Sequence, residues 1–107
     1  MFKITIFQSN GFFIGFDAYD HADYAEEGSD IVCAAASMLV TVTMSAIEQF
    51  TDLSFQQDID TDQARIVFRI TDFPNEKSEL LLKTLVLGME SLEENYEKHV
   101  DLIFEEV

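Results

Sequence analysis

The chain has 107 residues, 48% of them hydrophobic, which is enough for one compact core but too little for two. We therefore expect a single domain spanning residues 1–107. With 21 acidic residues against six Lys and Arg, the formal charge is −15, which argues against nucleic-acid binding because a phosphate backbone would be repelled. A basic partner or substrate fits this charge, and so does an acidic surface that is merely solvated.

The single cysteine and the first residues indicate the cell compartment. One cysteine cannot form an internal disulfide. The opening residues, MFKITIF, lack the basic region and the long apolar stretch of a signal peptide. We therefore expect a cytoplasmic protein.

The first residues have the pattern of a β-hairpin. Apolar and polar side chains alternate over residues 2–6, and the two-residue period resumes over 12–16. Asn10-Gly11, between them, is the strongest short signal for a hairpin turn. A polar loop is expected over 17–29.

A long helix is predicted from a cap at Ser29 or Asp30 to about Phe50. Apolar residues line two sides of it: Ile31, Ala35, Met38, Val42 and Ala46 on one, and Ala36, Val40, Met44 and Ile47 on the other. Residues 31–47 carry no charge, but they fall short of a membrane span and have no flanking Lys or Arg. The pattern favours burial in a core or in a subunit interface over a membrane.

The second half repeats the order of strands and helix. Strands are predicted over 53–59 and 66–70, and helical spacing follows from Leu81 to His99. Gly88 within that helix marks either a close helix approach or a tolerated glycine. Alternation over 100–104 predicts a short last strand. The order ββαββαβ predicts an α+β, layered domain in which a mixed sheet packs with two long helices.

Residues 21–37, HADYAEEGSDIVCAAAS, combine the cysteine with one of the two histidines. A thiol needs activation because its reference pKa is about 8.5 and the thiolate is the nucleophile. Cys33 near a helix start would be favoured as an anion, and His21 could act as general base and then as general acid. Asp30 either caps the helix or orients His21.

Residue types alone leave other interpretations of this segment open. Cysteine is often a buried core residue, so the proximity of Cys33 to His21 could be coincidence. Zinc is disfavoured because there is no CxxC or HxxxH spacing, and we expect no metal and no cofactor. His99 is interpreted as a packed or helix-terminal residue rather than a ligand.

The segment HADYAEEGSDIVCAAAS resembles the signature of the bacterial ribosomal-processing cysteine protease family, Prp. In that family a histidine, then Ala, Tyr-Ala and Gly, precede an Asp-Ile-Val-Cys-Ala-Ala helix start. The resemblance implies that Cys33 is the nucleophile, His21 its partner and Asp30 the acidic residue of the site. It also implies a homodimer of ββαββαβ subunits that removes a short N-terminal extension from a large-subunit ribosomal protein, numbered twenty-seven in the usual scheme. Cleavage there follows an aromatic residue and precedes a basic mature N-terminus.

Two positions depart from the family pattern. Asp20 and Asp23 stand where the family often has glycine. We expect these carboxylates to contact basic substrate residues, and Asp20, Asp23, Gly28 and Ser37 are the candidate substrate-binding residues.

Two other functions fit the sequence without the family signature. One is a non-catalytic acidic module that binds a basic ribosomal protein, in which Cys33 would be a core residue. The other is a small regulatory domain that binds a metabolite on a sheet face, since fold does not settle function.

Overall fold

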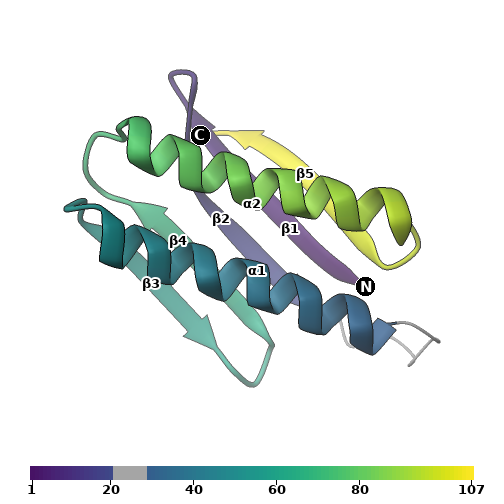
Figure 1. The fold of residues 1–107 in the computed structure, drawn as a ribbon. Coiled ribbons are helices and arrows are strands. Elements are labelled where there is room, and N and C mark those ends of the chain that lie inside the picture. Colours follow the sequence, from purple (N-terminus) through teal and green to yellow (C-terminus); the bar gives the residue numbers. More distant parts are fainter. Residues whose placement is uncertain (21–28) are drawn as a thin grey trace.

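The computed structural model describes residues 1–20 and 29–107, except for the side chains of residues 29 and 30. In chain order the elements are β1 (Phe2–Ser9), β2 (Phe12–Asp20), α1 (Ser29–Phe50), β3 (Phe55–Asp60), β4 (Arg65–Ile70), α2 (Glu76–Asn95) and β5 (Val100–Glu106). The predicted ββαββαβ order and the α+β class are confirmed (Figure 1).

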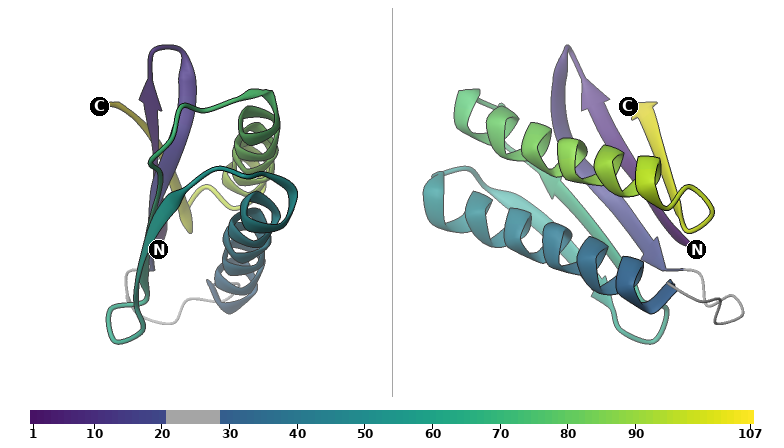
Figure 2. Two further views of the ribbon diagram at one scale, coloured as in Figure 1. Left: turned by 90° about the vertical axis from the view of Figure 1, so that its left-hand side faces the viewer. Right: turned by 45° about the vertical axis from the view of Figure 1, so that its right-hand side comes forward.

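The five strands form one sheet in the order β3-β4-β2-β1-β5. Neighbouring strands are antiparallel except β1 and β5, which are parallel. Both helices lie on the same face of the sheet, so the molecule has two layers (Figure 2). The sheet is therefore mixed, as expected, and the core lies between the sheet and the helices.

The β1–β2 hairpin turns at the predicted dipeptide. Asn10 has a φ of 53° and Gly11 a φ of 82°, so both residues are in the left-handed region. Two successive positive φ angles are typical of a type I′ turn, whose twist suits a two-residue hairpin.

Alternate residues of β1 and β2 form the floor of the core. Ile4, Ile6 and Phe16 are fully buried, and the Phe16 ring stacks on Phe68 of β4 with centroids 5.4 Å apart. Such a pair adds about 0.5–1.5 kcal/mol to the contribution of buried area. The inward stripe of α2 includes Leu82, Leu85 and Met89, which cover this floor.

Only one of the two apolar sides of α1 packs on the sheet. The buried positions are Val32, Ala36, Val40, Thr43 and Ile47. Within the described residues, one helix, spanning 31–50, is long and apolar enough to cross a membrane. Its buried stripe instead packs against the sheet, as a core helix does.

The two helices approach each other at Gly88 of α2. A Cβ at position 88 would lie 2.9 Å from Cδ1 of Leu39 on α1. Of the two interpretations of Gly88, the structure therefore supports the close helix approach.

The strand β2 continues beyond its expected end. Residues 17–20 were expected in a loop, but β2 runs to Asp20 because it pairs on both sides: Phe2 of β1 lies opposite Asp20, and Arg65 of β4 lies opposite Tyr19. The strand β3 also differs from the expectation, because it begins at Phe55 rather than at residue 53.

The expected extension of α2 to His99 is wrong. The helix ends at Asn95, and the Tyr96 N–H caps it by donating to the Leu92 carbonyl. His99 lies in the turn before β5, where its carbonyl accepts from the Phe2 N–H at 2.8 Å. The chain leaves the helix because Val100 begins the parallel pairing of β5 with Phe2 of β1.

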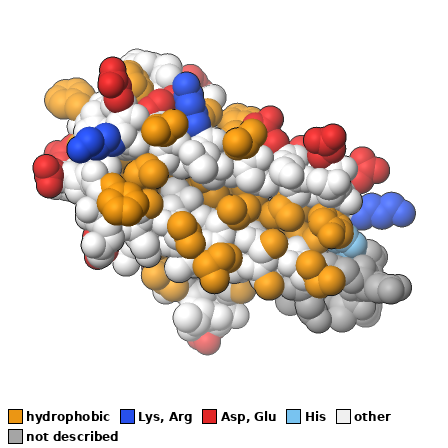
Figure 3. Space-filling model, in the orientation of Figure 1, with side chains coloured by type: hydrophobic (Ala, Val, Ile, Leu, Met, Phe, Trp, Pro, Cys, Tyr) orange, Lys and Arg blue, Asp and Glu red, His pale blue; other side chains and the backbone are white. Residues whose placement is uncertain are grey.

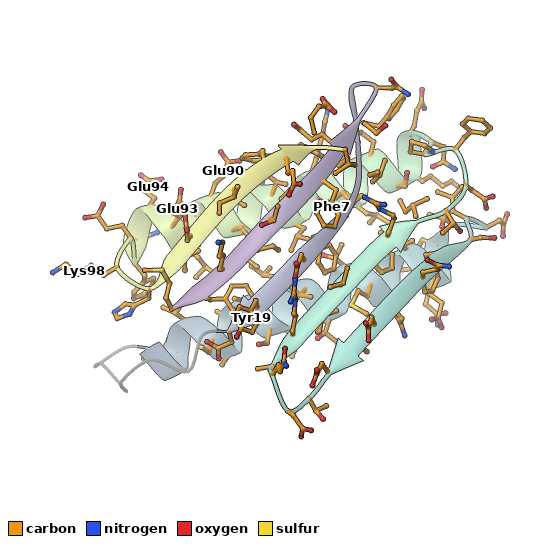
Figure 4. All side chains as sticks on the ribbon, turned by 180° about the vertical axis from the view of Figure 1, so that it is seen from behind. Phe7, Tyr19, Glu90, Glu93, Glu94 and Lys98 are labelled. Carbon is orange, nitrogen blue, oxygen red and sulfur yellow. The ribbon has the colours of Figure 1, made fainter. Side chains whose placement is uncertain are left out.

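The strand β5 is last in the sheet order and has a side-chain contact from the helix layer. The Leu102 N–H donates to Oε2 of Glu93 on α2 at 2.9 Å. Figure 4, seen from the sheet side of the molecule, shows Glu93 beside β5.

Candidate functional site

The single cysteine lies where α1 starts. Cys33 is the fifth residue of α1, which begins at Ser29, and its side chain is half-buried. Side chains of a helix lean toward its N-terminus, so the Cys33 side chain lies over the first turn. Amide groups of that turn have no partner within the helix, which makes the helix start favourable for negative charge.

Cys33 contacts the end of a central strand. Its thiol donates a hydrogen bond to Oδ2 of Asp20, with 3.0 Å between Sγ and Oδ2. Asp20 is the last residue of β2, and its own N–H donates to the Ala64 carbonyl at 3.0 Å. The backbone that carries this carboxylate is thus paired with β1 on one side and hydrogen-bonded to Ala64 on the other.

A hollow of about 180 Å³ opens beside this contact. Ser37, one helical turn after Cys33, and Asp20 both line it. Its other walls come from the sheet, α1 and the β3–β4 turn: Phe2, Ala18, Val40, Ile59, Asp60, Thr61, Ala64, Arg65 and Ile66. Since a cavity of about 150 Å³ accepts a benzene molecule, this hollow has room for one apolar side chain of a ligand.

One residue of the hollow's wall, Arg65, carries its positive charge on the other face of the sheet. Arg65 is held by Asp17 through two hydrogen bonds, from Nε at 2.9 Å and from Nη2 at 2.5 Å. The hydrogen bond to Asp17 is also the main reason that the pKa of Arg65 is raised above its usual value. Arg65 therefore stays positively charged, and its guanidinium is paired with Asp17.

The structure brings together only some of the residues that the sequence predicts for the site. Asp20 and Ser37 line one hollow, and Cys33 is hydrogen-bonded to Asp20. His21, Asp23 and Gly28 lie outside the described residues, and so does the side chain of Asp30, whose backbone is part of α1.

The direct contact between Cys33 and Asp20 was missed from the sequence, which predicted only a substrate contact for Asp20. The signal was the two-residue period of β2: extended by four residues, it puts Ala18 and Asp20 on the same side of the sheet.

In residues 1–20 and 29–107 no group of three His, Cys, Asp or Glu side chains is arranged to hold a metal.

Comparison with known proteins identifies this arrangement. The family described as Cysteine protease Prp matches residues 1–101. The chain is therefore a cysteine protease by family. The Ribosomal processing cysteine protease Prp of Staphylococcus aureus strain Mu50 is 32% identical over 82 residues, which are 77% of each chain. This protein belongs to the Prp family of ribosomal processing cysteine proteases.

Solved structures extend the likeness to nearly the whole chain. The Prp of S. aureus in complex with a substrate peptide superposes with a TM-score of 0.91 at 26% identity, covering 98% of this chain and all of the other. The same enzyme in complex with a covalently linked product peptide gives a TM-score of 0.86 at 27% identity, with the same coverage. The layers and the helix start that carries Cys33 thus belong to the common fold.

Proposed function

We propose that this protein is a cysteine endopeptidase that removes the short N-terminal extension of a large-subunit ribosomal protein precursor, the one numbered twenty-seven in the usual scheme. The observation that carries the proposal is the position of Cys33. It is the only cysteine of a chain that belongs to a cysteine protease family, and it lies half-buried beside a hollow at the start of α1. The names of the relatives, ribosomal processing proteases, support the substrate class.

In the proposed mechanism His21 removes the thiol proton of Cys33, and Sγ attacks the scissile carbonyl carbon. Free amides of the first turn of α1 stabilise the oxyanion. The C–N bond breaks as His21 returns the proton to the leaving amine, and water then releases the acyl group from sulfur. Asp30 either orients His21 or caps α1. A relative that holds a covalently linked product peptide is consistent with this route.

The charge of the chain supports a basic substrate. The formal charge is −15, and the carboxylate of Asp20, a residue of the hollow, contacts Cys33. An acidic protein speeds its encounter with a basic peptide by long-range attraction. Asp20, Asp23, Gly28 and Ser37 are the residues proposed to contact the peptide.

The outer side of α1 supports a homodimer. Ile31, Met38, Val42 and Phe50 have exposed fractions between 55% and 67%. Figure 3 shows hydrophobic side chains gathered over this helix. An apolar surface of this kind marks an interface, and a second copy presents the same surface across a twofold axis. We propose that α1 pairs two subunits, that the whole chain acts as one protease domain, and that it works in the cytoplasm without binding nucleic acid or membrane.

The deciding experiment mixes the purified protein with the co-encoded ribosomal precursor and reads product masses. Wild type should release one short N-terminal peptide, whereas Cys33→Ser and His21→Ala should release none. His99→Ala is the matched control, since His99 lies in the turn before β5, and it should cleave like wild type. An intact precursor in a stable complex with the wild-type protein would instead favour the acidic binding module.

A further inference from the structure

The hydrogen bond between Cys33 and Asp20 joins two elements that the core holds in place. Asp20 ends a strand that pairs with β1, and its N–H is bonded to Ala64. Cys33 follows Val32 on α1, and the Val32 side chain is fully buried. The 3.0 Å contact is therefore set by the packing of α1 on the sheet rather than by a chance encounter of surface side chains.

The chemistry of the contact favours one form of the thiol. An ionised carboxylate accepts hydrogen bonds but cannot donate one, so the contact requires the S–H form of Cys33. A thiolate at the same place would face a like charge. A like charge at this range disfavours the ionised form of the thiol. Attack on a peptide requires the thiolate, so Asp20 opposes the first step of the proposed mechanism.

We propose that Asp20 is a positioning residue that holds the Cys33 thiol protonated and directed at the end of β2 while no substrate is bound. The inference rests on the proposed function, in which Cys33 is the nucleophile. Asp20 also lines the hollow beside Cys33, where a basic side chain of a substrate can pair with it. Arg65 is also a residue of that wall, but its guanidinium is bonded to Asp17 on the other face of the sheet and does not neutralise Asp20. A cationic substrate thus removes the restraint, and a neutral peptide does not.

Alkylation of Cys33 tests the restraint without any substrate. The full-length protein is treated with iodoacetamide at pH 7, and the modified fraction is followed by intact mass. Asp20→Asn keeps the side-chain shape but removes the charge, and it should react about tenfold faster or more, since a one-unit shift changes the thiolate population about tenfold. Asp20→Glu keeps the charge and should stay slow. Asp58→Asn removes a charge on β3 and should react within about twofold of wild type.

A second reagent separates a charge effect from a loosened fold. Asp20→Asn should increase the rate of alkylation by negatively charged iodoacetate more than the rate of alkylation by neutral iodoacetamide. Simple exposure of the thiol would increase both rates equally. Equal gains, an unchanged rate or a slower rate in Asp20→Asn would overturn the proposal, and a slower rate would make Asp20 a proton acceptor. These outcomes do not depend on whether the ribosomal precursor is cleaved.

Cleavage supplies the test of substrate charge. Two peptides are compared: the basic precursor peptide and a neutral version in which Gln replaces Lys and Arg. Asp20→Asn should raise kcat/KM by a larger factor for the neutral peptide than for the basic one. Equal factors for the two peptides would show that a substrate cation does not relieve the restraint.

Discussion

Gly15 of β2 lies directly against the backbone of β4 at Phe68. A Cβ at position 15 would overlap the Phe68 carbonyl oxygen and would come within 2.9 Å of the Arg69 Cα. The two strands are neighbours in the middle of the sheet, with Gly15 opposite Arg69. Any side chain at this position would therefore push β2 and β4 apart.

The first prediction is that Gly15→Ala destabilises the protein strongly. The clash is with backbone, which cannot rotate away, so the loss should reach the upper end of overpacking costs, about 3 kcal/mol or more. For a domain of this size that corresponds to a fall in the thermal midpoint of more than about 10 °C. Gly88→Ala is the control: it meets only the tip of the flexible Leu39 side chain, and it gains helix propensity. Equal midpoints for the two variants would contradict the prediction.

The second prediction concerns the forked pair of Arg65 and Asp17. Arg65→Lys keeps the charge but loses one of two hydrogen bonds, and because Arg65 is exposed the loss should be at most about 1 kcal/mol in urea unfolding. The pKa of Arg65 is raised in the folded state, mainly by Asp17, so its contribution to stability is complete below the ordinary pKa of arginine and is lost only at still higher pH. The effect of Arg65→Lys should therefore be the same at pH 6 and pH 9. Additive losses in Arg65→Lys, Asp17→Asn and the double variant would show that the pair is not coupled.

The third prediction tests the outer side of α1 as the subunit interface. Val42→Glu places a carboxylate in the middle of the apolar surface and should weaken self-association about tenfold or more. Thr41→Glu, one position along the same helix and also exposed, is the control for added charge. Sedimentation over a range of concentrations measures both. A wild-type mass that is monomeric at every concentration would refute the dimer.

The fourth prediction concerns Asp23, which lies outside the described residues. If Asp23 contacts a basic residue of the substrate, Asp23→Asn should lower kcat/KM for the basic precursor peptide about twofold to fivefold, the range of an exposed charge pair. The salt dependence of cleavage should fall as well. Unchanged kinetics and unchanged salt dependence would remove Asp23 from the substrate site.

Local signals in the sequence were sufficient for most of the fold. The Asn10-Gly11 turn needs two residues with positive φ, and few other dipeptides suit it, so its position was predictable. The side of α1 that faces the sheet was not predictable, because both sides carry the same kinds of apolar residue and only packing distinguishes them. The end of α2 was also missed. Tyr96 and His99 keep a helical spacing, but the helix ends earlier because Val100 pairs with Phe2 in the sheet.

The site was predictable in its chemistry but not in its contacts. A single cysteine at a helix start, within a specific family signature, pointed to Cys33. Its neighbour Asp20 is 13 positions away along the chain, and the two meet only because β2 and α1 pack together. The two-residue period of β2 shows which side of the sheet Asp20 faces, but no pattern in the sequence shows which residue of α1 it meets there.

The bond from Leu102 to Glu93 has a consequence for how copies of this protein can meet. An outermost strand offers unpaired amide groups to any passing strand, which is a common route to aggregation. On β5 one of those groups is already taken by Glu93, and Asp101, Glu105 and Glu106 place negative charge along the same strand. Strand addition at this edge would have to displace a carboxylate and bring acidic side chains together, so it is disfavoured. Open-ended growth of the sheet needs both of its edges, so protection of β5 limits it, whereas the proposed pairing of two copies through α1 does not use this edge.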